Sequence, residues 1–259
     1  MVYDYEWFEK AYYDLTKIEL SCYKEKQMRR RIETLMSKKG ITTYDGFIEQ
    51  LKKDHDLFEE FISYLTINVS EFFRNPEQWK YMIESVFPEL IDRFGQNLKI
   101  WSAACSTGDE PYSLVMALSK LIPIEKIKIH ATDIDKQIME KARLGIYDKR
   151  SIVSLPADLK AQYFESVGSA YRISETIKKH VQFEQHDLLK DNYGSGYNMI
   201  ICRNVIIYFT EEAKDEIFKK FYKALAPGGI LFIGSTEQII GYKEIGYERI
   251  NTFFYRKPQ

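Results

Sequence analysis

The chain has 259 residues, of which 45% are hydrophobic and 29% are charged, and its formal net charge at pH 7 is −1. This length allows one large domain or two modest ones, and the near-zero charge excludes a general attraction to nucleic acid. No apolar run is long enough to span a membrane, and the N-terminal stretch is not typical of a signal peptide. The 3 cysteines have no CxxC spacing, so we expect reduced thiols in a cytoplasmic protein and no metal site.

The first 65 residues show helical periodicity and no strand pattern. Apolar residues at helical spacing predict helices over residues 5–20, 22–39, 44–53 and 57–65. The second of these is dense in arginine and lysine, including Arg29, Arg30 and Arg31. Its basic face is either a solvated surface or a docking surface for an acidic partner.

The segment 66–76 breaks this period and is the predicted link to the rest of the chain. Asn68, Ser70 and Arg74 are polar residues set among apolar ones. They either face a cleft between domains or belong to a capped, salt-bridged linker. A helix is expected over residues 76–94, beginning at a proline.

A buried strand, a turn of small residues and a helix are predicted over residues 98–113. The helix is expected to begin at Pro111, where a missing N–H costs nothing. The turn has one glycine, Gly108, whereas a dinucleotide fingerprint needs three, so a pyrophosphate is a poor fit. The next strand ends at Asp133, where an acidic residue would bind a ribose. A ribose without a diphosphate indicates a nucleoside such as S-adenosylmethionine; the alternative is an ordinary α/β unit without a ligand.

The C-terminal part alternates strands with helices, which predicts a mainly parallel sheet covered on both faces. Asp187 follows one strand, where it would accept from an adenine amino group or cap a loop. Arg203 and Asn204 follow another strand, and ligands of open α/β sheets bind at such ends. Residues 145–180 have no clean period and suggest an insertion. Strands are expected at 181–184, 197–202 and 230–234, helices at 135–144 and 211–226, and an edge pair within 245–256.

Four segments resemble the CheR family of chemotaxis receptor methyltransferases, in the same order along nearly the whole chain. They are residues 66–74 (TINVSEFFR), 104–113 (ACSTGDEPYS), 131–135 (ATDID) and 202–209 (CRNVIIYF). The resemblance implies an α/β fold, with a Rossmann-like S-adenosylmethionine-dependent methyltransferase domain at 76–259 and a small all-α N-terminal domain and linker at 1–75. The insertion at about 145–180 would be a short β-subdomain.

The resemblance also implies the reaction. Enzymes of this family transfer a methyl group from S-adenosylmethionine to glutamate side chains on chemoreceptor cytoplasmic helices, leaving S-adenosylhomocysteine and a glutamate methyl ester. The attacking carboxylate is already ionised at neutral pH, so no general base is required. The 4 histidines show no pairing pattern that would suggest one.

Carried over motif by motif, the resemblance implies a cofactor site. Its residues would be Asn68, Ser70, Arg74, Glu110, Asp133, Asp187, Leu188, Arg203 and Asn204. Many relatives have threonine and asparagine in place of Ser70 and Asp187, and both exchanges keep an oxygen acceptor.

We assign a role to each part of this site. Asp133 is expected to bind the ribose and Arg74 the cofactor carboxylate, with Glu110 near the polar tail or ribose. Asp187 and Leu188 would hold the adenine. The substrate carboxylate would be oriented by Arg203 and Tyr208.

The resemblance implies an acidic partner for the basic helix predicted over residues 22–39, because the methylation helices of the receptors are rich in glutamate. Arg29, Arg30 and Arg31 are expected to steer that substrate. We expect a monomer that neither binds nucleic acid nor inserts into a membrane. The alternatives are a small-molecule or nucleic-acid methyltransferase, a non-catalytic S-adenosylmethionine-sensing module, and a nicotinamide dehydrogenase. The single-glycine turn disfavours the last.

Overall fold

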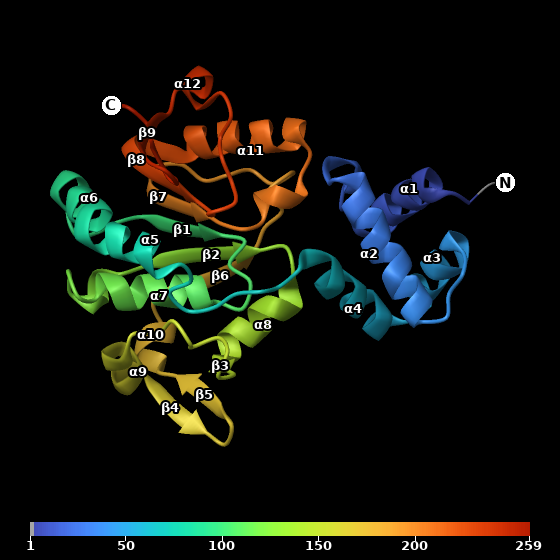
Figure 1. Ribbon diagram of the computed structural model, residues 1–259, viewed down its shortest axis with the longest axis horizontal. Helices are drawn as coiled ribbons and strands as arrows, with labels where there is room; N and C mark the ends of the chain where they lie inside the picture. Colours follow the sequence, from blue (N-terminus) through green and yellow to red (C-terminus); the bar gives the residue numbers. More distant parts are fainter. Residues whose placement is uncertain (1–2) are drawn as a thin grey trace. The chain divides into compact units, whose positions relative to one another are not determined.

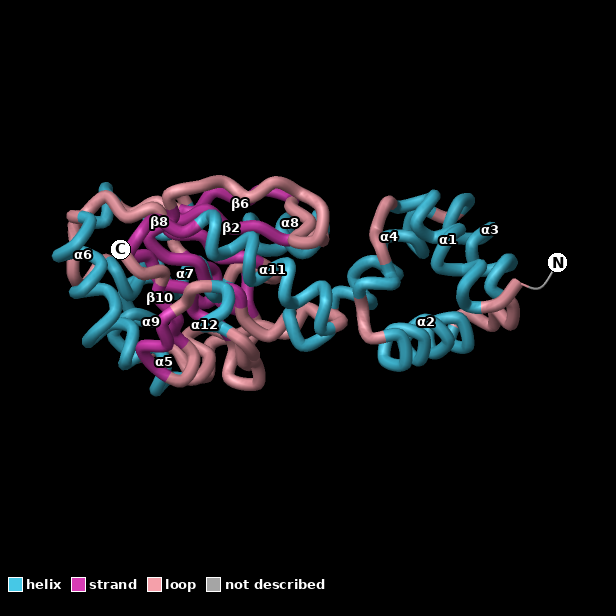
Figure 2. Tube along the Cα trace, turned by 90° about the horizontal axis from the view of Figure 1, so that it is seen from above, coloured by secondary structure: helices cyan, strands magenta, loops and turns pink. Residues whose placement is uncertain are grey.

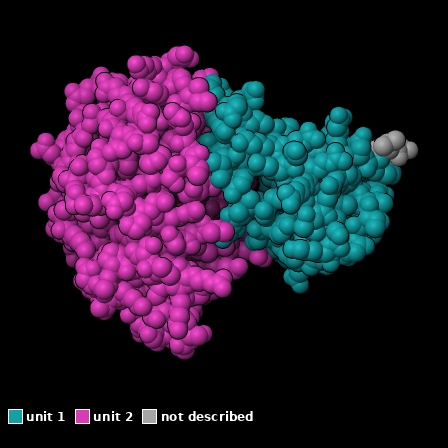
Figure 3. All heavy atoms as spheres, viewed as in Figure 1, with its two compact units in different colours: residues 1–68, 206–216 teal, residues 69–205, 217–259 magenta. Residues whose placement is uncertain are grey.

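The computed structural model describes residues 3–259, and its contacts divide the chain into two compact units (Figure 3). The helical unit comprises residues 1–68 and 206–216, and the sheet unit comprises residues 69–205 and 217–259. Residues 69–75, which the sequence analysis grouped with the helical part, make their contacts in the sheet unit. The main sheet and the small sheet both belong to the sheet unit, where Figure 2 shows the strands gathered.

The helical unit contains four helices where the periodicity predicts them. Three have an N-cap side chain that accepts a hydrogen bond from a backbone N–H of the first turn. The first is shorter than expected because Lys17 adopts a left-handed conformation (φ 62°) and ends it. The bounds are α1 (Tyr5–Thr16), η1 (Leu20–Cys22), α2 (Glu25–Lys38), α3 (Tyr44–Lys53) and α4 (His55–Thr66).

Aromatic rings fill the centre of the helical unit. Phe8 and Tyr12 of α1 stack at 5.9 Å, and Phe61 of α4 meets Phe47 of α3 edge-on at 5.0 Å. All four side chains are fully buried. Such offset and edge-to-face pairs are the arrangements that aromatic rings prefer, so they fix how these helices pack.

A distant piece of the chain completes the helical unit. The backbone N–H of Lys24 donates to the Tyr208 carbonyl at 2.9 Å, and that of Thr210 donates to the Cys22 carbonyl at 2.9 Å. Between these bonds, the rings of Tyr23 and Phe209 lie 4.8 Å apart. The short helix η4 (Ile206–Tyr208) and the first residues of α11 (Glu211–Ala224) therefore belong to this unit.

The sheet unit contains a seven-stranded sheet with the order β6-β2-β1-β7-β8-β10-β9. The first five strands are parallel, and β9 and β10 form an antiparallel pair at one edge. This confirms the expected mainly parallel α/β fold with an edge pair at the C-terminus. The bounds are β1 (Ile100–Ala103), β2 (Ile129–Asp133), β6 (Val181–Gln185), β7 (Tyr197–Cys202), β8 (Leu225–Ile233), β9 (Glu248–Asn251) and β10 (Phe254–Arg256).

Helices cover both faces of this sheet, as expected for parallel strands that are buried on both sides. α7 (Asp109–Leu118) and α8 (Lys136–Leu144) lie on one face (Figure 1). On the other face, Phe221 of α11 packs edge-on against Trp101 of β1 at 5.5 Å.

Residues 76–94 are helical throughout but change their hydrogen-bonding pattern in the middle. α5 (Pro76–Tyr81) and α6 (Phe87–Phe94) flank a π-helical turn, η2 (Met82–Val86), in which the Phe87 N–H donates to the Met82 carbonyl. Pro88 cannot donate to the carbonyl four residues before it, so the helix is locally widened rather than ended.

The predicted insertion forms a small antiparallel sheet with the order β3-β5-β4, drawn below the main sheet in Figure 1. This confirms the short β-subdomain. Its strands are β3 (Ile146–Tyr147), β4 (Phe164–Val167) and β5 (Ala170–Ile173). The remaining short elements of the unit are η3 (Ile124–Lys126), α9 (Ala157–Tyr163), α10 (Glu175–Lys178) and α12 (Tyr242–Ile245).

The strand order reverses between β1 and β7. From β1 the chain adds β2 and β6 on one side, and then β7 and β8 on the other. Ala103 pairs with Thr132 of β2 and with Cys202 of β7, so the residues after these three strands lie at one edge of the sheet. Ligands of open α/β sheets bind at such a reversal.

Two features are absent from residues 3–259. None of their helices has the length and apolar character needed to cross a membrane. They also contain no group of three or more histidine, cysteine, aspartate or glutamate side chains placed to hold a metal ion.

Candidate active site

Asp133, at the end of β2, is the most buried of the predicted ribose-binding groups, with 6% of its surface exposed. Its Oδ2 accepts the backbone N–H of Ser106 at 2.8 Å, and its Oδ1 accepts that of Asp135 at 3.0 Å. Burial raises the pKa of Asp133 to about 6, although these backbone bonds oppose the shift. An ionised carboxylate has about four acceptor sites, so Asp133 keeps the capacity to accept a ligand hydroxyl group in addition to its backbone bonds.

The turn between β1 and α7 brings backbone amides to the same edge. Ala104, Ser106 and Gly108 have positive φ angles of 61°, 50° and 84°. A Cβ on Gly108 would lie 2.9 Å from the Cβ of Ala142, so this position requires glycine. The helix begins at Asp109 and not at Pro111 as predicted, and Pro111 still lies in the first turn, where its missing N–H has no intrahelical acceptor.

Asp109, at the start of α7, is fully buried. Its Oδ2 accepts the Thr107 hydroxyl, and its Oδ1 has no hydrogen-bond partner among the described residues. Burial raises the pKa of this carboxyl to about 6.

Glu110 and Arg203 form an ion pair where the strand order reverses. Arg203 Nη1 donates to Glu110 Oε2 at 3.3 Å, with only 4% and 14% of the two side chains exposed. Ser102 of β1 donates its hydroxyl to Glu110 Oε1 at 2.8 Å. Burial raises the pKa of Glu110, and the charge of Arg203 is the main effect opposing it.

Arg203 also binds the end of the linker and the start of α5. Its Nη2 donates to the Arg74 carbonyl at 3.0 Å, to Asn75 Oδ1 at 2.8 Å and to Gln78 Oε1 at 3.0 Å. Its guanidinium lies 4.8 Å from the centre of the Phe232 ring. Arg203 Nε is a buried donor without a partner among residues 3–259. Burial lowers the pKa of Arg203 from its usual value, and Glu110 opposes this effect.

Two of the predicted site residues precede this cluster in the sheet unit. Arg74 is half-buried; its Nη1 donates to the Val69 carbonyl at 3.2 Å, and its charge acts to lower the pKa of Glu110. Ser70 is also half-buried.

Asp187 and Leu188 follow β6, the neighbour of β2. Asp187 Oδ1 accepts the backbone N–H of Leu189 at 2.8 Å, which is the loop-capping interaction that the sequence left open. Leu188 is 7% exposed. The His186 N–H donates to the Asp133 carbonyl at 3.0 Å and fixes the start of this loop beside the ribose-binding candidate.

The structure thus brings together Glu110, Asp133, Arg203 and Asn204 at the carboxyl ends of β1, β2 and β7. Asn68 and Tyr208 belong to the helical unit. There, Asn68 Nδ2 donates to Thr66 Oγ1 at 2.8 Å, and the Tyr208 carbonyl accepts from Lys24.

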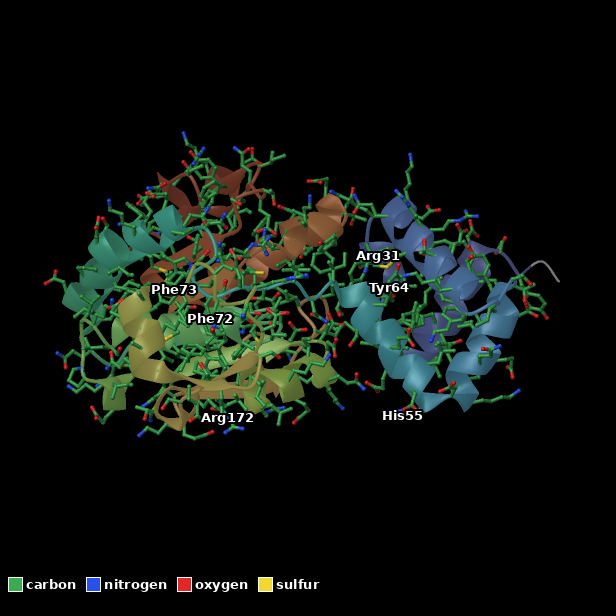
Figure 4. The ribbon with its side chains drawn as sticks, turned by 60° about the horizontal axis from the view of Figure 1, so that its bottom comes forward. Arg31, His55, Tyr64, Phe72, Phe73 and Arg172 are labelled. Carbon is green, nitrogen blue, oxygen red and sulfur yellow. The ribbon has the colours of Figure 1, made fainter. Side chains whose placement is uncertain are left out.

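The three arginines proposed for docking differ in their surroundings. Arg30 is exposed, whereas Arg29 Nε donates to Glu33 Oε1 at 2.9 Å. Arg31 donates to the backbone carbonyl of Tyr64, and its guanidinium lies 4.6 Å from the centre of that ring. Figure 4 labels the two residues close together.

Some residues of the site were missed by the sequence analysis. The ion pair has further hydrogen-bond partners: Glu110 accepts from Ser102, and Arg203 donates to Asn75 and Gln78. The Glu237 carboxylate accepts the backbone N–H groups of Asn204 and Val205. Asn75 and Gln78 directly follow a recognised motif, so polar side chains there were a usable signal. Glu237 follows the next strand, where ligand-facing side chains are also expected.

A second polar cluster lies elsewhere on the sheet. His130 joins Tyr197 Oη at 3.0 Å and Glu184 Oε2 at 3.0 Å, a pairing that the sequence did not reveal. Tyr197 is the first residue of β7, about 16 Å of strand from Cys202 at the site's edge. This cluster therefore does not supply a base to the candidate site.

The residues present fit a nucleoside with a charged tail. Asp133 provides a carboxylate acceptor at the end of β2, and Arg203 Nε is an unused donor two strands away among residues 3–259. The Arg74 guanidinium adds a positive charge near Glu110. A carboxylate for the ribose and cations for a carboxylate tail are the groups that such a ligand requires.

Comparisons with known proteins identify the family of this chain. Residues 3–66 match the family model described as the CheR methyltransferase all-alpha domain, and residues 68–252 match its SAM-binding domain. A chemotaxis protein methyltransferase of Listeria monocytogenes is 41% identical over 254 residues, covering 98% of this chain and 97% of that protein. One of Borreliella burgdorferi is 31% identical over 251 residues, covering 92% and 89%. The chain therefore belongs to the CheR family of S-adenosylmethionine-dependent chemotaxis methyltransferases.

Proposed function

We propose that this enzyme methylates glutamate side-chain carboxylates on the cytoplasmic helices of chemoreceptors, in adaptation to chemical stimuli. The observation that carries the proposal is the match of both family models and of the Listeria monocytogenes chemotaxis protein methyltransferase along nearly the full chain. S-Adenosylmethionine supplies the methyl group from a positively charged sulfonium, and the acceptor oxygen belongs to an ionised carboxylate.

The chemistry of the candidate site suits such an acceptor. A glutamate with its ordinary pKa is ionised at neutral pH and needs no proton acceptor from the enzyme. The enzyme's contribution is then to orient two reactants and to exclude water, which lowers the barrier without acid–base groups.

Individual residues have distinct proposed roles. Asp133 accepts the ribose hydroxyls, Asp187 and Leu188 hold the adenine, and Arg74 pairs with the carboxylate of the cofactor's tail. Arg203 fixes the Glu110 carboxylate beside that tail. Contact of Arg203 with the substrate carboxylate, as the resemblance implies, requires one of its present hydrogen bonds to open or its Nε to be used.

The remaining assignments come from the helical unit and from the linker. Asn68 and Ser70 are proposed to line the cofactor site, and Tyr208 to help orient the substrate carboxylate. The proposal also assigns docking to the N-terminal part, predicted as residues 1–75, and catalysis to the part predicted as 76–259, in a cytoplasmic monomer. By their contacts, residues 69–75 belong to the sheet unit and residues 206–216 to the helical unit.

The direct test is methyl transfer from methyl-labelled S-adenosylmethionine to a chemoreceptor cytoplasmic fragment, followed by mild base. We expect label on the fragment that leaves as volatile methanol, because carboxyl methyl esters hydrolyse under these conditions. A fragment whose methylation-region glutamates are replaced by alanine should accept no label. Base-stable label would instead indicate N-methylation, and cofactor binding without transfer would favour a sensing module.

Charge reversal on α2 tests the docking surface. Arg30→Glu should lower kcat/KM for the receptor fragment several-fold at low salt and less at high salt, because an exposed charge acts mainly on association. Arg30 is the suitable position because it is exposed, whereas Arg31 is held by Tyr64.

Lys53→Glu, on the neighbouring helix α3, is the matched control, since the side chain of Lys53 is 76% exposed. It should leave kcat/KM nearly unchanged. Equal effects of the two reversals would argue against docking through α2.

A further inference from the structure

Glu237 joins two loops at the candidate site through its carboxylate. It follows β8 and is 7% exposed. Its Oε2 accepts the N–H of Gly234 at 2.6 Å and that of Asn204 at 3.1 Å, and its Oε1 accepts the N–H of Val205 at 3.1 Å. Three backbone donors on one buried carboxylate form a strong, directional connection.

The hydrogen bonds of Glu237 begin where the backbone pairing of β7 and β8 ends. β7 and β8 are paired in parallel up to Cys202 and Ile233. Beyond this pair the chain enters the two loops, and the carboxylate bridges the N–H groups of Asn204 and Gly234. Glu237 is itself fixed, because its own N–H donates to the Gly234 carbonyl at 3.1 Å.

The loop after β7 needs such support. Asn204 has a left-handed backbone with φ 61°, a conformation that asparagine adopts more readily than most residues but that is still less common than an extended or helical one. Two successive N–H groups, of Asn204 and Val205, point at the same carboxylate and so fix the peptide between them. The backbone that carries the Asn204 side chain is thereby held in place.

The Glu237 carboxylate packs closely against Gly234. A Cβ at Gly234 would lie 2.6 Å from Glu237 Oε2 and 2.8 Å from the backbone nitrogen of Asn204. Glu237 also favours the charged form of its neighbour Arg203, acting to raise that residue's pKa.

We propose that Glu237 is a positioning residue of the methyltransferase site, which acts by holding the loop after β7 so that Asn204 faces the cofactor. The inference rests on the proposed placement of the cofactor beside Asn204. It assigns Glu237 no contact with the cofactor or the substrate.

A double-mutant cycle tests this action through Asn204. The affinity for S-adenosylmethionine is measured by calorimetry for the unaltered enzyme, Glu237→Gln, Asn204→Gly and the double variant. Glycine is chosen because it removes the side chain and still allows the positive φ angle. Glu237→Gln should raise the dissociation constant about tenfold, since a small misplacement of a binding group is enough for such a loss.

In the Asn204→Gly background, Glu237→Gln should change the affinity less than twofold, because the group it positions is already absent. A purely structural role predicts the same loss in both backgrounds, and that result would overturn the proposal. So would an unchanged affinity for Glu237→Gln alone.

Two further variants keep the test decisive. Glu89→Gln removes a carboxylate that binds Arg256 in the same unit and should leave the affinity unchanged. If Glu237→Gln does not fold, Glu237→Asp replaces it in the cycle, because it keeps the charge and draws the carboxylate back from the N–H groups of Asn204 and Val205. Because the readout is cofactor binding, failure of the receptor assay would overturn the proposed substrate and leave this inference standing.

Discussion

Asp133→Asn should raise the dissociation constant for S-adenosylmethionine about 30-fold, a loss of about 2 kcal/mol. The carboxylate is fixed by backbone N–H groups of Ser106 and Asp135, so it can accept ribose hydroxyls without rearranging. Asparagine keeps the shape and one acceptor oxygen, but it removes the charge that strengthens each hydrogen bond. Isothermal titration calorimetry would measure this change directly.

Asp135→Asn is the matched control two residues away. Asp135 is as buried as Asp133, but its Oδ1 caps α8 by accepting the Ile138 N–H at 3.1 Å, and asparagine caps helices equally well. We expect less than a twofold change in affinity. An Asp133→Asn enzyme that binds the cofactor as this control does would disprove the ribose assignment.

The same carboxylate should make cofactor binding depend on pH. Its pKa of about 6 in the cofactor-free enzyme means that it is largely protonated at pH 5 and ionised at pH 7. Since the ionised form is the stronger acceptor for a ribose hydroxyl, affinity should increase as the pH rises through 6 and then level off. Asp109 has a similar pKa, so the assignment requires that Asp133→Asn, and not Asp109→Asn, abolishes this dependence.

Arg203→Met should lower the free energy of unfolding of the sheet unit by about 3–5 kcal/mol, because it leaves a buried carboxylate without its cation. Glu110 would lose Arg203 and keep only the Ser102 hydroxyl. The oxygens of Asn75 and Gln78 would also lose a charged donor. Urea unfolding followed by tryptophan fluorescence measures this loss, with Trp7→Phe as background so that Trp79 and Trp101 report on the sheet unit.

Two comparisons make this result specific. Arg256→Met breaks a more exposed pair, with 24% of the arginine and 33% of Glu89 accessible, and should cost about 1 kcal/mol. Adding Glu110→Gln to Arg203→Met should recover part of the lost stability, since no unpaired charge remains. Equal losses for Arg203→Met and Arg256→Met would show that burial does not strengthen the Glu110–Arg203 pair.

Much of the fold was predictable because buried helices and strands have regular patterns of apolar residues. β7 forms over residues 197–202 as predicted, since a strand covered on both faces is a continuous apolar run. The single-glycine turn and Asp133 at the end of β2 indicate where a nucleoside would bind, and that placement stays a prediction. These signals are local, so one stretch of chain contains all of each.

What escaped prediction depends on contacts between distant residues. Glu237 binds backbone N–H groups some 30 positions away, and any residue but proline supplies such a group. The partners of Arg203 lie more than 90 positions before it, so no spacing rule relates them. The start of α7 was predicted at Pro111 from the proline alone and lies two residues earlier, at Asp109. Gly108, in a left-handed conformation, is the N-cap of this helix.

Because the helical unit consists of two separate chain segments, it limits where such an enzyme can be truncated or joined to a homologue. The chain passes between the two units three times, after residues 68, 205 and 216. A fragment that starts at residue 69 would keep Phe209 and the Tyr208 carbonyl but lose Tyr23 and the Lys24 N–H that they contact. The helical unit is therefore not an interchangeable end module. A chimaera that takes residues 1–68 from a homologous enzyme would also have to take residues 206–216 from it, so that the helical unit packs as in one protein.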